Sequence, residues 1–355
     1  MKYLLFCGAG NSLAPDELKA RYGVAKELFP NTFELEFSSD QEAITFSGIL
    51  GSSIKLAKLE DLFGASIESF ASLINNKNFS VTDLRTKKSD PKQNQDLKNI
   101  LGKGRFVLGT DSYGLSPIII SKHKIDEIFV DAEANLVWKT IWVHDYNKWI
   151  KKDRFMPHVN AKAGMLPPKI ARSMINLAPN QVWGEGKLLV DPFCGSGRVL
   201  VEGAELGFGV AGADILDSQC QQTKENLAFL GHKSQVFCLD STHLSTKFKN
   251  NIDLIVTEPF MGKPNPRPDK IKYLVPGLEK LYLGCLKDWY QALKPNGVVV
   301  MVFPWFNDGK KDYKTSQIID GRLALSYNQL NQGILYSRPD ASVKREIIVL
   351  QKISK

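Results

Sequence analysis

The fold is decided by the stretch Leu188-Leu189-Val190-Asp191-Pro192-Phe193-Cys194-Gly195-Ser196-Gly197. Its apolar start predicts a buried strand that ends in an acid, and its glycine-rich turn leads into a helix predicted over Arg198–Leu206. Gly195 and Gly197 let the backbone approach a ligand closely, because no Cβ is in the way. Such a turn lies at the carboxyl end of a strand, where doubly wound sheets bind nucleotides.

The flanking sequence repeats this alternation of strand and helix. Strands are predicted at Lys187–Val190, Gly209–Ala213, Gln235–Leu239, Leu254–Thr257, Val298–Phe303, Gly333–Tyr336 and Arg345–Gln351. Helices are predicted at Lys169–Asn176, Arg198–Leu206, Ser218–Leu230 and Leu278–Leu293. Strands this apolar are buried on both faces, which is typical of a parallel sheet. A turn at Pro339-Asp340 joins the last two, so we predict a doubly wound sheet of seven strands closed by an antiparallel pair.

Acids end three consecutive strands of this predicted sheet. Asp191 ends the first, Asp214 the second and Asp240 the third. A carboxylate at 214 can accept both ribose hydroxyls of a nucleoside, and one at 240 can face an adenine amino group. We therefore predict a nucleoside-binding rim, which also includes the neighbouring residues Phe193, Ile215 and Ser241. The alternative is that each acid only caps the helix that follows it.

The fourth predicted strand ends in Glu258-Pro259-Phe260. An acid here, with a backbone carbonyl, can hold an exocyclic amino group and aim its lone pair at a methyl group, while an aromatic ring stacks on the base. Acid–proline–aromatic runs are typical of enzymes that methylate amino groups, so these residues are the predicted catalytic set. A generic strand–loop turn is the alternative, because proline suits turns. Cys194 is interpreted as a packing residue, since this chemistry needs no covalent nucleophile.

The segment Gly262–Lys272 is predicted to be a loop made rigid by prolines. It carries four cations, Lys263, Arg267, Lys270 and Lys272. Beside a base pocket these side chains would contact phosphates, so they are assigned to substrate binding. A solvated, lysine-bearing surface loop is the alternative.

The first half of the chain has a different pattern. Residues 1–80 suggest a β-α-β-β-(β)-α order, which suits a small ferredoxin-like α+β unit. Strands are predicted at Tyr3–Cys7, Thr32–Phe37, Ala43–Phe46 and Ser53–Leu59, and helices at Ala14–Tyr22 and Leu62–Ile74. Further on we expect a solvated loop at Arg85–Lys98, strands at Arg105–Gly109 and Pro117–Ile120, a hairpin of Glu127–Val130 with Leu136–Val143, and a linker from His144.

Composition restricts the class of protein. The chain has 355 residues, of which 43% are hydrophobic and 24% charged, so it is a globular protein of two or three domains. Its net charge of +8 points toward nucleic acid. The five cysteines include no CxxC pair, which argues against a metal site or disulfides and for a reduced, cytoplasmic protein. No run of about 18 apolar residues is present, so no membrane span is expected.

The run Ala163–Ala178, AGMLPPKIARSMINLA, resembles the segment that precedes the methyltransferase core in the archaeal and eukaryotic tRNA guanosine-10 N2-methyltransferases. The glycine-rich loop is similar to theirs. So are the tail Tyr336-Ser337-Arg338-Pro339-Asp340 with Lys344-Arg345-Glu346-Ile347, and the start of the chain with Gly8, Asn11-Ser12-Leu13-Ala14 and Glu17-Leu18. The resemblance covers 161–355 and, more weakly, the first 75 residues.

The resemblance implies a class I (Rossmann-like) methyltransferase domain at 165–355 that uses S-adenosyl-L-methionine. Before it come a ferredoxin-like unit at 1–80, a partial THUMP-like RNA-binding region at 81–143 and a linker at 144–164. The methyl acceptor would be the N2 amino group of a guanine in tRNA, at position 10, and the family leaves room for a small activator protein subunit. The implied cofactor residues are Asp191, Gly195, Gly197, Asp214 and Asp240; Glu258, Pro259, Phe260 and Pro168 lie on the substrate side.

The sequence also departs from this family. The usual Asp-Pro-Pro-Tyr is Glu-Pro-Phe-Met here, Arg198 stands where threonine is common, and residues 77–150 are short for a full THUMP domain. Two rival functions remain open: a DNA methyltransferase acting on adenine or cytosine amino groups, and a non-catalytic RNA-binding protein that keeps the fold. The ferredoxin-like unit favours RNA over DNA, and the intact nucleoside-binding rim favours an enzyme.

Overall fold

The chain divides into two units. Unit 1 comprises Met1–Gly10 and Tyr22–Trp149, and unit 2 comprises Asn11–Arg21 and Ile150–Lys355. The computed structural model describes residues 1–8, 10–61, 66–102, 104–109, 114–159, 165–263, 265–337 and 343–354. The predicted turn at Pro339-Asp340 lies outside these ranges, and so do residues 62–65 of the predicted second helix, Ala163, Gly164 and Pro264.

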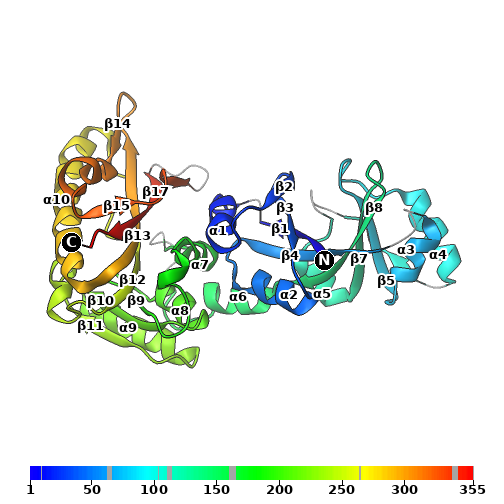
Figure 1. Cartoon of the computed structure of the whole chain (residues 1–355), viewed down its shortest axis with the longest axis horizontal. Coiled ribbons are helices and arrows are strands. Elements are labelled where there is room, and N and C mark those ends of the chain that lie inside the picture. The colour runs from blue at the N-terminus through cyan, green and yellow to red at the C-terminus, as the bar shows by residue number, and fades with distance from the viewer. Residues whose placement is uncertain are drawn as a thin grey trace. The chain divides into compact units, whose positions relative to one another are not determined.

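Unit 1 contains one eight-stranded sheet, with the order β2-β3-β1-β4-β8-β7-β5-β6 (Figure 1). Its strands are β1 (Lys2–Cys7), β2 (Lys26–Phe29), β3 (Thr32–Glu36), β4 (Ser53–Leu59), β5 (Asn78–Asp83), β6 (Arg105–Phe106), β7 (Ile125–Asp131) and β8 (Leu136–Val143). Strands β4-β1-β3-β2 are antiparallel throughout, which is the strand order of a ferredoxin-like unit. The predicted hairpin is formed by β7 and β8.

The helices of unit 1 are α2 (Asp40–Ile49), α3 (Ile67–Leu73), α4 (Pro91–Leu101) and α5 (Pro117–His123), while α6 (Tyr146–Arg154) runs on into unit 2. Three of them correct the sequence predictions. The expected strands Ala43–Phe46 and Pro117–Ile120 lie in α2 and α5, and the expected loop Arg85–Lys98 contains most of α4. Each begins at a side chain that accepts a backbone N–H of the first turn: Ser39 for α2, Asp90 for α4 and Ser116 for α5.

Unit 2 contains a nine-stranded sheet whose main path is β11-β10-β9-β12-β13-β17-β15. Its strands are β9 (Leu188–Asp191), β10 (Gly209–Asp214), β11 (Gln235–Cys238), β12 (Ile252–Thr257), β13 (Leu293–Asn307), β14 (Asp312–Lys314), β15 (Tyr327–Gln329), β16 (Ile334–Tyr336) and β17 (Val343–Lys352). The strands from β11 to β13 are parallel, and β17 joins β13 antiparallel. All seven predicted strands are present; β14 and β15 are additional.

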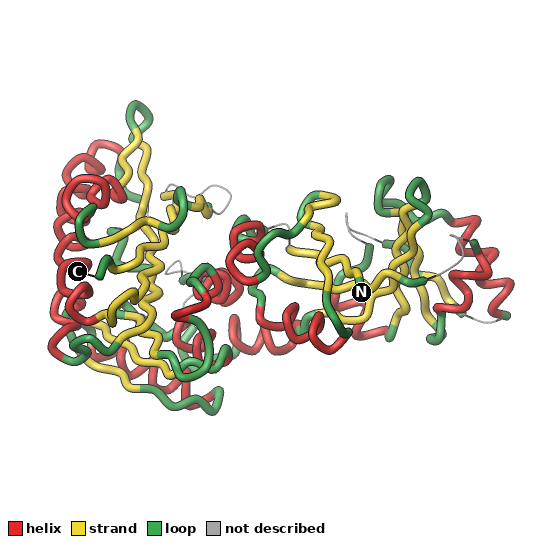
Figure 2. The backbone as a smooth tube through the Cα atoms, in the orientation of Figure 1, coloured by secondary structure: helices red, strands yellow, loops and turns green. Residues whose placement is uncertain are grey.

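Helices cover both faces of this sheet (Figure 2). They are α1 (Ala14–Arg21), α7 (Pro168–Asn176), α8 (Arg198–Glu205), α9 (Asp217–Phe229) and α10 (Pro268–Ala292), with the 3₁₀-helices η2 (Asn180–Val182), η3 (Ser241–Thr246) and η4 (Thr315–Gln317) and the π-helix η5 (Ile319–Leu323). On β13, Val298 and Val300 pack in the core with α7 and α8, whereas Val299 and Met301 pack in the core with α10. Burial on both faces explains why these strands are continuously apolar.

Helix α10 begins ten residues before its predicted start, at Pro268 instead of Leu278. Proline fits the first turn of a helix, where its missing N–H would have no partner. Lys270 and Lys272, which the sequence analysis placed in a loop, therefore lie on the first turns of a helix. Among the described helices, none has the length and apolar character that crossing a bilayer requires.

Candidate active site

The glycine-rich turn connects β9 to α8, and two backbone hydrogen bonds help to fix it. The Cys194 N–H donates to the carbonyl of Ala213 on β10 (2.9 Å), and the Gly197 N–H donates to the carbonyl of Cys194 (2.7 Å). Gly195 has φ +53° and Gly197 has φ +87°. Both lie in the left-handed region that favours glycine. A Cβ at 197 would also come within 3.0 Å of the Thr223 methyl group, so a larger residue does not fit there.

A cavity of about 170 Å³ opens beside this turn. Its lining residues are Met165, Leu166, Asp191, Phe193, Cys194, Gly195, Ser196, Arg198, Val199 and Glu258. Four residues that the sequence assigned to a site, Asp191, Phe193, Gly195 and Glu258, therefore meet in one place. They come from the ends of β9 and β12, the two neighbouring strands in the middle of the sheet. This is the edge at which doubly wound sheets bind ligands.

Asp191 is the buried carboxyl group of this cavity. Its Oδ1 accepts hydrogen bonds from the Thr257 hydroxyl (2.7 Å) and the Phe193 N–H (3.1 Å). Burial raises the pKa of Asp191 to about 7, and the charges of Asp214 and Glu258 add to that rise, while the two hydrogen bonds oppose it. A carboxyl group with this pKa can gain or lose its proton near neutral pH, and a cation bound nearby would favour its ionised form.

Asp214 and Asp240 stand at the ends of the next two strands. One oxygen of Asp214 accepts the Gly195 N–H (3.1 Å) and the other accepts the Leu216 N–H (3.0 Å), so this acid holds the glycine-rich turn. Asp240 caps η3, accepting both the N–H and the hydroxyl of Thr242 at 2.8 Å, and these bonds hold its pKa below the usual range. The capping alternative is thus realised at Asp240, whose side chain remains exposed.

Two other residues predicted for the rim, Ile215 and Ser241, each follow one of these acids in sequence. Ile215 is 67% exposed. Ser241 is buried, and its hydroxyl donates to the carbonyl of Pro192 in the turn. The carbonyl of Ser241 accepts the Trp289 indole N–H of α10 (2.9 Å). Neither Ile215 nor Ser241 lines the cavity, but Ser241 connects η3 to the turn that does.

Arg198, which stands where the resembled family commonly has threonine, was not among the predicted site residues, yet it lines the cavity. It is buried, and it donates to the carbonyls of Lys152 and Asp153 at the end of α6. Burial lowers the pKa of its guanidinium, and the charges of Asp153 and Glu202 oppose this. The first residue of α8 therefore fastens residues 152–153 to the glycine-rich turn.

Glu258 begins the predicted catalytic run and is paired with Arg345 of β17. The Arg345 Nε donates to Glu258 Oε1, and the two side chains are 10% and 15% exposed. Pro259 is buried, whereas Phe260 is 58% exposed. The carbonyl of Phe260 accepts the hydroxyl of Tyr282 (2.7 Å), which fixes the backbone of the run against α10. This run thus offers a nearly buried carboxylate at 258 and an exposed aromatic ring two positions later.

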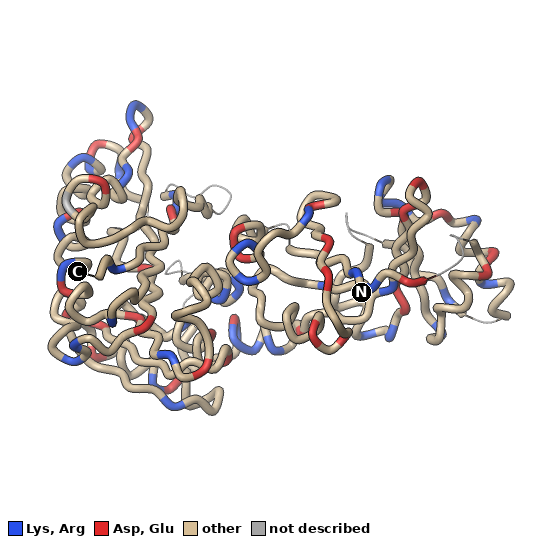
Figure 3. The backbone as a smooth tube through the Cα atoms, in the orientation of Figure 1, with Lys and Arg blue, Asp and Glu red and all other residues tan. Residues whose placement is uncertain are grey.

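The predicted phosphate-binding cations lie outside the cavity. Lys263, Arg267, Lys270 and Lys272 are all exposed, and Arg267 pairs with Asp269 (3.1 Å). Basic and acidic residues are interspersed in both units (Figure 3). The assignment of these four cations to phosphate binding therefore depends on their position close to the Glu258 run in sequence, and not on the net charge of the chain. Pro168 is buried at the start of α7, and the nearby residues Met165 and Leu166 line the cavity.

Two residues of α9 hold the turn and were missed by the sequence analysis. The Thr223 hydroxyl donates to the carbonyl of Gly195 (2.7 Å), and the Asn226 amide donates to the carbonyl of Ser196 (2.8 Å). Both side chains are fully buried. The signal that could have found them is a pair of polar residues three apart, hence on one face of a helix that packs behind the turn.

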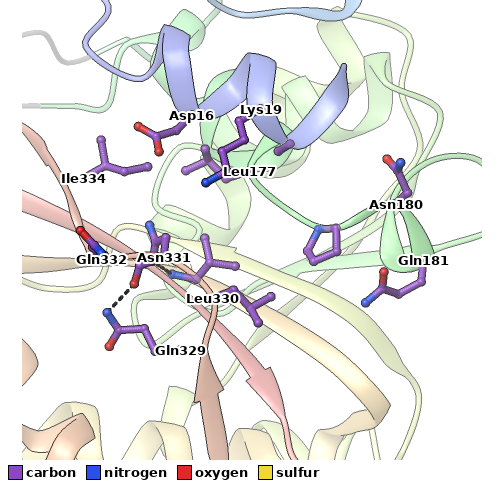
Figure 4. Close-up of a pocket in the computed structure, with 13 residues that line it drawn as sticks. Asp16, Lys19, Leu177, Asn180, Gln181, Gln329, Leu330, Asn331, Gln332 and Ile334 are labelled. Carbon is purple, nitrogen blue, oxygen red and sulfur yellow. Dashed lines mark hydrogen bonds between the residues drawn. The ribbon is translucent and has the colours of Figure 1, made fainter. Parts of the chain in front are cut away.

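A second cavity, of about 830 Å³, lies elsewhere in unit 2 (Figure 4). It is lined by α1, by the segment after α7 and by the segment from β15 to β16, including Lys19, Asn180, Gln181 and Gln332. The two cavities share no lining residue. Only the smaller one contains residues that the sequence assigned to a site.

Residues 158–315 match the family described as "RMKL-like, methyltransferase domain". Among curated proteins, the chain is 33% identical over 146 residues to the tRNA (guanine(10)-N2)-dimethyltransferase of Methanothermobacter thermautotrophicus, which is 41% of this chain and 40% of that protein. It is 31% identical over 142 residues to the protein of the same name from Pyrococcus abyssi, 39% of each. The chain therefore matches about two fifths of the length of these relatives.

The fold of the whole chain is also similar to that of a solved structure. TrmN from Thermus thermophilus has a TM-score of 0.56 to this structure, with 17% sequence identity, and the match covers 99% of this chain and 100% of that one. Unit 2 has the parallel sheet, the glycine-rich turn and the strand-end acids that the sequence predicted. Residues 158–315, which match the RMKL-like methyltransferase domain family, contain that turn and Glu258.

Proposed function

We propose that this protein transfers a methyl group from S-adenosyl-L-methionine to the exocyclic N2 amino group of a guanine in tRNA, at position 10. The observation that carries the proposal is the cavity in which the glycine-rich turn and Asp191 meet Glu258. The matching relatives support the choice of substrate, because both are named tRNA (guanine(10)-N2)-dimethyltransferases.

The turn and the strand-end acids fit the cofactor. A Cβ at Gly195 would meet no atom closer than 3.9 Å, so this side of the turn is open to a ligand. Asp214 ends β10 where it can accept ribose hydroxyls, and Asp240 with Ile215 and Ser241 would surround the adenine. S-adenosylmethionine supplies a methyl group on a positively charged sulfur. Asp191, Phe193, Gly195 and Gly197 would hold that part, with the Asp191 carboxylate offsetting the positive charge.

The acceptor side is formed by Glu258, Pro259 and Phe260. The Glu258 carboxylate would accept a hydrogen bond from the N2 amino group and orient its lone pair, while the exposed Phe260 ring would stack on the guanine. The chain's contribution is to hold the two reactants in line and to stabilise charge, without a covalent intermediate. Cys194 takes no part in this, because burial raises the pKa of its thiol well above its ordinary value.

The tRNA would be held outside the cavity. Lys263, Arg267, Lys270 and Lys272 are proposed to contact its phosphates. The ferredoxin-like residues 1–80, the partial THUMP-like region 81–143 and the linker 144–164 are proposed to contact the rest of the tRNA. A small activator protein subunit is a further proposed partner. We also propose a cytoplasmic location, since all five cysteines are free thiols.

The test is incubation of the protein with bulk tRNA and labelled S-adenosylmethionine, followed by nucleoside mass spectrometry. We expect label in N2-methylguanosine or its dimethyl form. Label in adenine or cytosine of DNA incubated in parallel, with none in tRNA, would support the rival DNA enzyme, and cofactor binding without transfer would support the non-catalytic alternative. Glu258→Ala should abolish transfer while cofactor binding, measured by calorimetry, survives, and Asp214→Ala should weaken that binding.

A further inference from the structure

The ion pair between Glu258 and Arg345 joins the proposed acceptor site to a strand that the catalytic motif does not include. Arg345 lies near the start of β17, opposite Pro304 of β13, and β13 separates β17 from β12. The Arg345 Nε donates to Glu258 Oε1 across 87 positions of the sequence. With side chains only 10% and 15% exposed, the pair is largely shielded from water.

The surroundings of Glu258 are rich in acids. The titratable and charged side chains near it or lining the same cavity are Asp191 of β9, Cys194 of the turn, Arg198 of α8, Asp214 of β10, Tyr282 of α10 and Arg345 of β17. The charges of Asp214 and Glu258 both contribute to the raised pKa of Asp191. Among the described residues, Arg345 is a cation in direct contact with the Glu258 carboxylate.

A nearly buried carboxylate without a cation beside it tends to take up a proton, because burial penalises the charged form. A protonated carboxyl group donates one hydrogen bond and is a much weaker acceptor than a carboxylate. Glutamate is also flexible, and a guanidinium donor that engages one oxygen restricts the direction of the other. Protonation or a free orientation of the Glu258 carboxylate would each weaken the hydrogen bond that it is proposed to accept from the incoming amino group.

We propose that Arg345 is a positioning residue for methyl transfer, holding Glu258 charged and oriented toward the acceptor amino group. This inference rests on the proposed function, because it assigns Arg345 a role only through Glu258. Arg345 is not proposed to contact the cofactor.

The experiment compares Arg345→Ala, Arg345→Lys, Glu258→Gln and the double variant Arg345→Ala/Glu258→Gln. Lys344→Ala serves as the matched control, because it removes an exposed cation one position earlier on β17. Arg345→Ala should lower kcat by about 10- to 100-fold with a smaller change in KM for tRNA. The acidic limb of its kcat–pH profile should move to higher pH, since Glu258 then loses its proton less readily. Cofactor affinity should stay within about twofold of wild type.

Arg345→Lys should recover part of the activity, because lysine restores the charge without the planar guanidinium. In the Glu258→Gln background, Arg345→Ala should lower kcat by less than about twofold, because its effect acts through the carboxylate that this background lacks. The inference is overturned if the two substitutions are additive, if the pH profile of Arg345→Ala is unchanged, or if Lys344→Ala has the same effect. Loss of transfer in Glu258→Ala with full activity in Arg345→Ala would refute this inference alone. Absence of transfer by the wild type would refute the proposed function instead.

Discussion

Asp191 combines a buried position with a pKa near neutrality. Its carboxyl group lies at the end of β9 and accepts hydrogen bonds from Thr257 and the Phe193 N–H. Because its pKa in the folded protein, about 7, exceeds the ordinary 3.8, the folded state binds the Asp191 proton more tightly than the unfolded state does. Its contribution to stability is therefore fully present below pH 4 and is lost as the pH rises through about 7.

The substitution Asp191→Asn tests whether the stability contribution of Asp191 falls as the pH rises. The amide has the shape of the protonated acid and cannot ionise, so the variant should gain stability relative to wild type as the pH rises from 4 to 8. The rise in pKa sets an upper limit of roughly 4 kcal/mol on this gain. Urea unfolding of both proteins without cofactor, at several pH values, measures it. A stability difference that does not depend on pH would contradict the prediction.

Helix α9 supports the cofactor turn from behind, through Thr223 and Asn226. These residues are one turn apart on the helix and donate to the carbonyls of Gly195 and Ser196, at 2.7 and 2.8 Å. Since buried carbonyls need partners, α9 determines the conformation of the turn.

Thr223→Val should therefore weaken cofactor binding about 5- to 10-fold, the equivalent of one hydrogen bond of ~1 kcal/mol. Thr223→Ser keeps the hydroxyl and is the matched control. Calorimetric titration with S-adenosylmethionine measures both. A loss of affinity in Thr223→Ser with none in Thr223→Val would mean that the methyl group packed near Gly197, and not the hydroxyl, supports the turn.

The start of α10 is the basic and aromatic surface nearest in sequence to the Glu258 run. Tyr273 is 69% exposed, and the Lys272 ammonium lies 4.9 Å from the centre of its ring. Exposed aromatic rings beside lysines are suited to single-stranded nucleic acid, because the ring stacks on a base while the cations contact phosphates.

Lys270→Ala/Lys272→Ala should weaken tRNA binding, and it should reduce the slope of log affinity against log salt by about 1 for each lost phosphate contact. The control is Lys280→Ala/Lys287→Ala, which removes two exposed cations further along the same helix. Filter binding at several salt concentrations distinguishes the two. If the control pair changes the slope equally, the start of α10 has no special role.

The elements that the sequence predicted well are those whose burial leaves a periodic signature. Strands β9, β10, β12 and β13 are largely buried on both faces, and the pattern indicated them directly. The failures at α2, α4 and α5 arose where side-chain pattern and capping disagreed. In both Ser116-Pro117 and Asp90-Pro91, a capping residue is followed by proline at the first helical position. These local signals start a helix at 117, where the apolar run suggested a strand, and at 91, where the polar run suggested a loop.

The residues of the candidate site can likewise be divided into those that the sequence predicted and those that it did not. Glycines and acids at strand ends can be recognised from their neighbours in sequence, and Asp191, Gly195 and Glu258 do meet in one cavity. The contacts of Thr257 and Arg345 could not be predicted, because they depend on the order of the strands in the sheet. Arg345 reaches Glu258 only because β17 lies beside β13 and β13 beside β12.

At the scale of the whole molecule, residues 11–21 belong to unit 2 although the sequence on both sides belongs to unit 1. Helix α1 packs against α7 through polar groups that are all buried. Glu17 accepts the Ser173 hydroxyl (2.9 Å) and the Asn176 amide (2.6 Å), and the Asn11 amide donates to the Ser173 hydroxyl (3.0 Å). Unit 2 is thus completed by a segment that ends at Arg21, 129 positions before its main part begins at Ile150, and the sequence of 165–355 alone could not reveal this.

Glu17→Ala in the full chain tests whether unit 2 depends on this segment. The substitution leaves the buried Ser173 hydroxyl and Asn176 amide without their acceptor, and such losses cost about 2–4 kcal/mol. Hydrogen exchange read by mass spectrometry should show faster exchange in α7, with little change in the strands of unit 1. Lys19→Ala, an exposed position on the same helix, is the control and should leave α7 protected. Unchanged exchange in α7 of Glu17→Ala would mean that the β9-to-β17 sheet holds α7 in place without α1.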